Sequence, residues 1–144
     1  MLALERPAYI VMPGPISTNN LHRNIAGAGR VTTGNYRSWQ KAAGECLAAQ
    51  APLPRFGLPV EVTFFVGEKG VGMMDSDNVA KAYLDALVKA KVIHDDNRKW
   101  VRSSRPVWVP GLAGCVVEIR PARPAPTPTE IMARVPLGLR ELLR

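Results

Sequence analysis

Four aspartates stand out in a chain that is otherwise strongly basic. Asp75 and Asp77 are separated by one residue, and Asp95 and Asp96 begin eighteen positions after Asp77. The chain has 19 Lys and Arg against 12 Asp and Glu, a net charge of +7. Carboxylate oxygens are ligands that Mg²⁺ prefers, and an excess of Lys and Arg favours a nucleic-acid phosphate backbone as partner. The pattern therefore predicts a divalent metal ion held next to nucleic acid.

The first acidic pair has the spacing of two ligands of one ion. On an extended segment, side chains two positions apart point the same way, about 6–7 Å apart, so Asp75 and Asp77 can face one cation. Asp77 or Ser76 is also placed to cap the helix that follows, whose free N–H groups can receive a phosphate. The simpler alternative is that Asp77 is only a helix cap, Asp75 a solvated loop residue and Asp95-Asp96 a polar turn.

The residues after Asp77 form the clearest helical pattern of the chain. Small and apolar residues share one face and charged residues step by four along the other; the first set is Val79, Ala82, Tyr83, Ala86, Leu87 and Ala90, and the second is Asp77, Lys81, Asp85 and Lys89. A helix over residues 78–91 is about 21 Å long. Asp96 can therefore rejoin Asp75 only if residues 92–95 double back along the helix, or if it comes from a second subunit.

The rest of the sequence predicts the strands and the second helix against which the helix over residues 78–91 would pack. Alternation and apolar runs predict strands over residues 8–12, 60–66, 99–109 and 115–119, and helical spacing predicts an amphipathic helix over 36–50. Residues 17–34, rich in polar residues and glycine, read as a long loop. We expect an α+β fold, close to α/β, in which a mixed β-sheet packs with two main helices.

A change of composition divides the chain. Residues 1–120 form one predicted domain, and residues 121–144 form a proline-rich linker and a short helical extension. Thr127 and Glu130 have the form of a capping box around Pro128. Leu139, Leu142 and Leu143 give the extension an apolar stripe, and we expect it to pack on its own domain or on a twin subunit.

Several function classes are not indicated by the sequence. Cys46 and Cys115 stand singly, without a CxxC or a zinc-like grouping with histidine, which favours reduced, buried thiols. The sequence contains no P-loop, GxSxG or HExxH motif and no apolar run long enough to cross a membrane. We expect a protein of the cytoplasm that has no membrane partner.

The ordered run from Asp75 to Asp96 closely resembles the core motif of the RusA family of Holliday-junction resolvases. The residues that carry the likeness are Asp75-Ser76-Asp77-Asn78-Val79-x-Lys81-Ala82, then Asp85-Ala86-Leu87-x-Lys89-Ala90, then Asp95-Asp96. Pro15, Ser17, Asn19 and Asn20 also look like a segment that follows the first strand in that family. The likeness extends from about Tyr9 to Ile119.

The resemblance implies a small homodimeric endodeoxyribonuclease, of a kind often encoded by prophages, that acts on branched DNA. It assigns catalytic metal-binding roles to Asp75, Asp77 and Asp96, and makes Lys81 the essential basic residue. The implied cofactor is Mg²⁺, with Mn²⁺ as a possible substitute. Water would then hydrolyse a phosphodiester bond, and paired symmetric nicks would resolve a four-way junction in DNA recombination and repair.

The sequence departs from the family pattern at two places, and the first of them affects how DNA would be held. Met73 and Met74 stand where relatives can carry arginines, and Lys91 stands where a glycine commonly ends the helix. Other polar and basic residues must then contact the backbone; the candidates are Asn20, His22, Arg23, Arg30, Lys89, Arg98, Lys99, Arg102 and Arg105.

Two alternatives stay open from the sequence. One is a nucleic-acid-binding module without catalysis, which would use the basic loop together with Trp100 and Trp108. The other is a metal nuclease that acts on flaps, forks or duplex DNA. The sequence also leaves open whether one or two ions bind, and whether Asp96 acts in its own chain or across a dimer.

Overall fold

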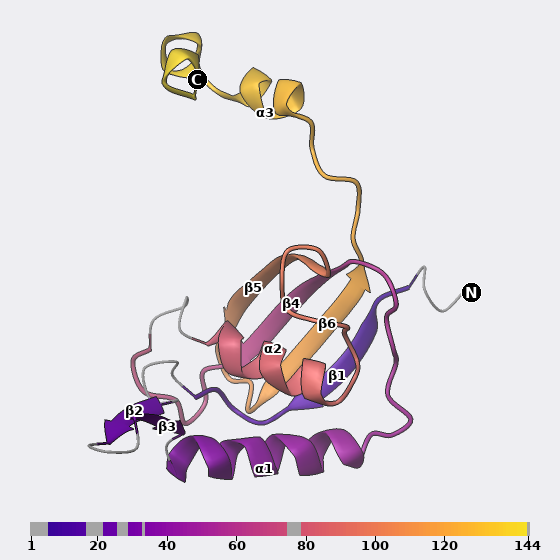
Figure 1. The fold of residues 1–144 in the computed structure, drawn as a ribbon, viewed down its shortest axis with the longest axis vertical. Coiled ribbons are helices and arrows are strands. Elements are labelled where there is room, and N and C mark those ends of the chain that lie inside the picture. Colours follow the sequence, from indigo (N-terminus) through magenta and orange to yellow (C-terminus); the bar gives the residue numbers. More distant parts are fainter. Residues whose placement is uncertain (1–5, 17–21, 26–28, 33, 75–78, 144) are drawn as a thin grey trace.

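The computed structural model describes residues 6–16, 22–25, 29–32, 34–74 and 79–143, and for 22–25 and 29–32 it describes the backbone alone. Its strands are β1 (Ala8–Met12), β2 (His22–Ile25), β3 (Gly29–Thr32), β4 (Val60–Gly67), β5 (Val101–Val109) and β6 (Cys115–Pro121). Its helices are α1 (Gly34–Ala48), α2 (Ala80–Lys89), α3 (Pro128–Arg134) and the 3-10 helix η4 (Leu137–Leu143). Figure 1 shows α1 and α2 beside a single main sheet.

The main sheet has four strands in the order β1-β6-β4-β5. β6 pairs antiparallel with both β1 and β4, whereas β4 pairs parallel with β5. The sheet is therefore mixed, and with two helices packed on it the predicted α+β fold is confirmed. α2 lies in the connection between the two parallel strands, because such a connection must cross from one end of the sheet to the other.

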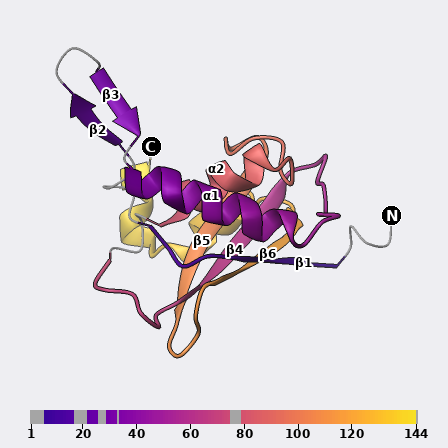
Figure 2. The ribbon, with the colours of Figure 1, turned by 90° about the horizontal axis from the view of Figure 1, so that it is seen from below.

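One face of the sheet forms the core. Alternate residues of β4, namely Val60, Val62, Phe64 and Val66, are fully buried, as strand alternation requires. Both helices lie on this side of the sheet (Figure 2). On the other face, Tyr9 and Val11 of β1 are exposed. The apolar positions of β4 therefore lie on the face of the sheet that the two helices cover.

Tyr83 joins α2, the sheet and α1 at the centre of the core. Its ring stacks on Phe64 of β4 with centroids 5.3 Å apart and meets the edge of Trp39 of α1 at 5.4 Å. Its hydroxyl donates to the Pro13 carbonyl oxygen at 2.7 Å, and Trp39 Nε1 donates to the Gly14 carbonyl at 2.7 Å. Burial raises the pKa of the Tyr83 hydroxyl, so it stays a donor. These bonds fix the segment after β1 against both helices.

The region predicted as a long loop contains regular structure. β2 and β3 form an antiparallel hairpin in which His22 pairs with Thr32 and Ile25 with Gly29. Four-residue strands without a run of apolar residues lack the alternating pattern from which strands are predicted. The expectation of an irregular loop was wrong for these eight residues.

The C-terminal extension has the predicted helix and cap. The Thr127 hydroxyl accepts from the Glu130 N–H at 3.1 Å, and Glu130 Oε2 accepts from the Thr127 N–H at 3.2 Å. At the start of the extension, the Arg123 guanidinium and N–H contact Glu61 of β4. Figure 1 shows α3 and η4 extending away from the sheet, and Leu137, Leu139, Leu142 and Leu143 are exposed. In this structure the stripe is not packed on its own sheet, and the division at residue 120 stays a prediction.

Candidate active site

The faces of α2 are those that the sequence predicts. Val79, Ala82, Tyr83 and Leu87 are buried and Lys81 and Lys89 are exposed. In the described part of the helix, Val79 occupies the N-cap position and makes no side-chain capping bond. Val79 is fully buried, so packing against the core accompanies the start of this helix, and the predicted cap by Ser76 or Asp77 lies outside the described residues.

The end of α2 turns the chain sharply backward. The Lys91 N–H donates to the Val88 carbonyl at 3.0 Å and the Val92 N–H to the Leu87 carbonyl at 2.9 Å, which together make a Schellman motif. Lys91 has a φ of 63°, the left-handed conformation that glycine adopts at this position without a steric penalty. Val92 and Leu87 are both fully buried, and their burial supports the reversal.

We expect Lys91→Gly to raise the free energy of unfolding by about 0.5–1 kcal/mol, because it removes the strain of a side chain in the left-handed region. Lys89→Gly is the matched control. Lys89 is the last residue of α2, where glycine should lower the free energy of unfolding by up to about 1 kcal/mol. Urea denaturation of both variants measures the difference. A loss of stability in Lys91→Gly would contradict the argument.

The returning segment places Asp96 beside the first turn of α2. α2 has ten residues and is about 15 Å long, a distance that residues 90–96 can span at about 3.3 Å each. Val92 and Ile93 are buried and fix the path of the return. Asp95 Oδ1 accepts from the Asp96 N–H at 2.7 Å and Asp95 Oδ2 from Asn97 Nδ2 at 3.1 Å. Asp95 thus organises the turn from which the Asp96 side chain projects.

Lys81 lies between two carboxylates. Its Nζ is 2.9 Å from Asp85 Oδ1, one helical turn further along α2, and 3.2 Å from Asp96 Oδ2. The hydrogen bond to Asp85 is the largest cause of the raised pKa of Lys81, against a smaller opposing effect of desolvation, and the bond to Asp96 adds to it. The three side chains are 52%, 37% and 30% exposed. Ion pairs this exposed contribute about 0–1 kcal/mol, so their importance is in fixing the ammonium rather than in stabilising the fold.

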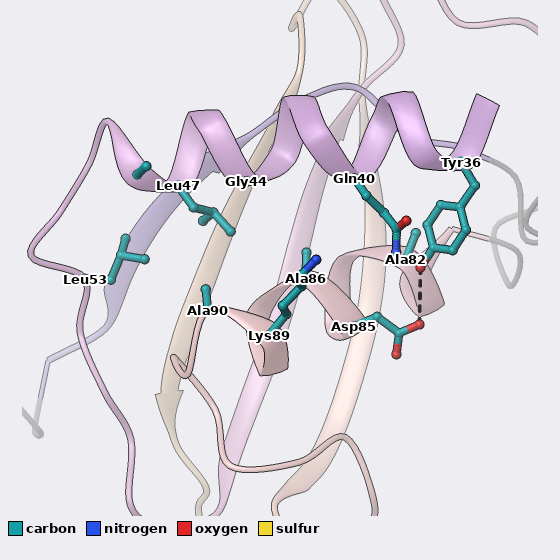
Figure 3. Close-up of a pocket in the computed structure, with 11 residues that line it drawn as sticks. Tyr36, Gln40, Gly44, Leu47, Leu53, Ala82, Asp85, Ala86, Lys89 and Ala90 are labelled. Atoms are coloured by element: carbon teal, nitrogen blue, oxygen red, sulfur yellow. Dashed lines mark hydrogen bonds between the residues drawn. The ribbon is translucent and has the colours of Figure 1, made fainter. Parts of the chain in front are cut away.

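The segment after β1 reaches the same side of the molecule. Ile16 packs on Tyr36 of α1 and Ala82 of α2. Tyr36 is buried, and its hydroxyl lies 3.4 Å from Asp85 Oδ2 (Figure 3). The start of the proline-serine-asparagine segment therefore lies next to the α2 turn that carries Lys81 and Asp85.

The structure brings Lys81 and Asp96 together, while the other acidic candidates are not described. Asp75, Asp77 and Asn20 lie outside the described residues. Within the described part of the chain, no three His, Cys, Asp or Glu side chains are grouped to hold a metal ion. The ligand set of Asp75, Asp77 and Asp96 thus stays a prediction, with the position of Asp96 now given.

The basic candidates fall into separate places. Arg98 and Lys99 are exposed and directly follow the Asp96 turn, and the Lys99 ammonium lies 5.2 Å from the centre of the Trp100 ring. Lys89 is exposed on α2, two turns beyond Lys81. His22, Arg23 and Arg30 belong to the hairpin strands β2 and β3.

Arg105 belongs to a different basic surface, and Arg102 lies between the two regions, because its guanidinium donates to the Arg98 carbonyl at 2.9 Å and it also lines a hollow with Arg123. Arg105 is exposed on β5 and pairs in register with Thr63 of β4, on the face of the sheet opposite to the helices. Hollows on this face are lined by Arg102, Arg105, Arg120 and Arg123 together with Glu61. Arg120 and Arg123 were not predicted from the sequence as part of this surface, although strand alternation along β6 places Arg120 on this face.

Tyr36 was not predicted from the sequence as a site residue, and Asp85 was predicted only as part of the charged face of its helix. The four-residue spacing from Lys81 could have identified Asp85. Tyr36 is 49 positions from Asp85, and local spacing carries no signal for a contact between separate elements.

Comparison with known proteins identifies the family to which most of the chain corresponds. A protein-family model described as endodeoxyribonuclease RusA matches residues 13–120, which contain α1, α2, β4, β5 and the Lys81–Asp96 contact. A search of curated proteins gave no match. Among the described residues, no helix combines the length and apolar character needed to cross a membrane. Since the match covers well over half of the 144 residues, the chain belongs to the RusA endodeoxyribonuclease family.

Proposed function

We propose that this protein is a divalent-metal-dependent endonuclease that resolves four-way DNA junctions. The observation that supports this best is the 3.2 Å contact between Lys81 and Asp96 within one chain. Lys81 belongs to the first part of the motif and Asp96 is its last residue, fifteen positions away. The contact favours an Asp96 that acts in the same chain as Lys81 over one supplied by a second subunit.

The residues near Lys81 have the chemistry that a hard cation requires. Asp96 is a partly exposed carboxylate whose Oδ2 faces a positive charge, and Asp77 precedes the N-cap residue Val79 by only two positions. We propose Asp75, Asp77 and Asp96 as ligands of Mg²⁺, because Mg²⁺ takes carboxylate oxygens and retains water molecules. When bound, the ion would act as a Lewis acid towards the scissile phosphate.

The protein side chains would bind and orient the DNA strand. Lys81 would donate to a non-bridging oxygen of the scissile phosphate and stabilise the charge that develops there. Arg98 and Lys99, exposed immediately after Asp96, would contact neighbouring phosphates. A homodimer with two-fold symmetry would present two such sites to two symmetry-related strands of a junction.

The test is cleavage of a labelled synthetic four-way junction with Mg²⁺, with Mn²⁺ or with chelator, beside Asp77→Asn. We expect paired symmetric nicks with either metal, and none with chelator or in the variant, while junction binding persists. Cleavage without metal would contradict the mechanism. Equal rates on flaps, forks and plain duplex would show a nuclease without junction specificity, and binding without cleavage would show a non-catalytic module.

A further inference from the structure

Among the residues that the structure describes, the Lys81 ammonium has two carboxylate partners, Asp85 and Asp96, and of these two Asp96 belongs to the proposed metal site. Lys81 Nζ lies 2.9 Å from Asp85 Oδ1 and 3.2 Å from Asp96 Oδ2. A lysine ammonium and a divalent cation compete for the same carboxylate, because both are held there by their positive charge. The interaction of Lys81 with Asp96 must therefore be broken or weakened when a metal binds Asp96.

Asp85 is itself held from the other side by α1. While Oδ1 of Asp85 accepts from Lys81, Oδ2 lies 3.4 Å from the Tyr36 hydroxyl. Figure 3 shows Tyr36 pointing from α1 towards Asp85 at one end of the groove between α1 and α2. Because both carboxylate oxygens have partners on different elements, the orientation of Asp85 is set by the packing of α1 against α2.

The Tyr36 ring is fixed by its surroundings. It is 4% exposed, stacks near Trp39 with centroids 6.3 Å apart, and packs on Ala82. The small Ala82 side chain lets α1 approach α2 closely enough for the hydroxyl to reach Asp85. A buried ring that presents a hydroxyl to a half-exposed carboxylate is a rigid support for that carboxylate.

We propose that Tyr36 and Asp85 are positioning residues that give Lys81 an alternative anion, so that Asp96 can bind the metal ion while Lys81 stays beside the scissile phosphate. This inference depends on the proposed metal-dependent nuclease function. Neither residue touches the reacting atoms in this scheme. Both act through Lys81. In many metal sites, residues that do not bind the ion themselves orient the side chains that do the chemistry.

The proposal predicts an effect on metal binding without DNA. In Asp85→Asn, Lys81 keeps Asp96 as its only carboxylate among these partners, so a metal ion must displace a tighter ion pair. We expect the Mn²⁺ dissociation constant to rise on the order of tenfold. Tyr36→Phe should change it in the same direction by less. Lys81→Met should abolish nicking without weakening Mn²⁺ binding, because the competing ammonium is gone.

A double-mutant cycle separates this mechanism from a general loss of negative charge. Mn²⁺ binding is titrated by electron paramagnetic resonance for Asp85→Asn, Lys81→Met and the double variant, with circular dichroism to establish folding. If Asp85 acts through Lys81, Asp85→Asn has little further effect in the Lys81→Met background. An equal loss of affinity in both backgrounds would overturn the proposal, because the carboxylate would then act directly on the ion.

Tyr9→Phe is the matched control for Tyr36→Phe. Its hydroxyl also donates to a carboxylate, Glu118 Oε2 at 2.8 Å, but on the exposed face of the sheet, so Mn²⁺ affinity should not change. Wild-type protein that neither binds Mn²⁺ nor needs metal for cleavage would refute the proposed function itself. Wild-type protein that needs metal, beside an Asp85→Asn variant of unchanged affinity, would refute only the positioning role.

Discussion

Asp96→Asn is expected to lower the rate of junction nicking by about 100- to 1,000-fold while leaving junction binding in place. The substitution removes the charge of a proposed metal ligand and keeps the size of the side chain. A metal ion in such a site supplies several kcal/mol of charge stabilisation in the transition state, and each 1.36 kcal/mol corresponds to a factor of ten in rate. Single-turnover cleavage in saturating Mg²⁺, with binding measured in chelator, separates the two effects.

The neighbouring aspartate provides the control for this experiment. Asp95 faces its own turn, where its two oxygens accept from the Asp96 N–H and from Asn97 Nδ2. Asn at position 95 retains one acceptor oxygen, so Asp95→Asn should reduce nicking only a fewfold. If the two variants lost activity equally, the assignment of Asp96 as the metal ligand of the pair would be wrong.

Gly67→Ala is expected to lower the free energy of unfolding by about 2–3 kcal/mol. Gly67 is the last residue of β4, and its N–H donates to the Gly114 carbonyl at 2.8 Å. An added Cβ would overlap the carbonyl group of Leu112 and lie 2.9 Å from the carbonyl oxygen of Gly114. Both are backbone atoms that cannot move aside without disturbing the β5–β6 connection, and overpacking of this kind typically costs about 1–3 kcal/mol.

A second glycine gives the opposite result and serves as the control. Gly44 lies inside α1, and a Cβ there would meet no atom within 4 Å. Gly44→Ala should therefore raise the free energy of unfolding by about 0.5–1 kcal/mol, because alanine loses less conformational freedom in a helix. Urea denaturation of the two variants should show midpoints shifted in opposite directions. A Gly67→Ala variant as stable as wild type would contradict the packing described around the end of β4.

The parts of the fold with regular side-chain patterns could be predicted from the sequence. The alternation in β4 and the four-residue steps of α2 gave the buried faces, because each pattern reports one element packed against one core. The family was also identified from the ordered motif, and the match over residues 13–120 confirms it. The β2–β3 hairpin was not predicted, because its strands are short and lack that periodicity.

The details of the site depended on contacts between distant residues. The sequence left two routes for Asp96, and its position beside Lys81 depends on Lys91 adopting a left-handed conformation and on the burial of Val92 and Ile93. The Tyr36 contact to Asp85 joins two helices that no short pattern relates. Asp75 and Asp77 lie outside the described residues, so their part in the site is still a prediction from the motif.

The order of the strands bears on when this nuclease becomes active during synthesis. β4, which precedes the acidic motif in the chain, lies between β5 and β6 in the sheet, and β6 also separates it from β1. A nascent chain that has left the ribosome only as far as Asp96 already carries every proposed catalytic side chain, but neither neighbour of its central strand. Because the crossover that holds those side chains needs this strand pairing, the growing polypeptide should not cut DNA until translation has passed β6.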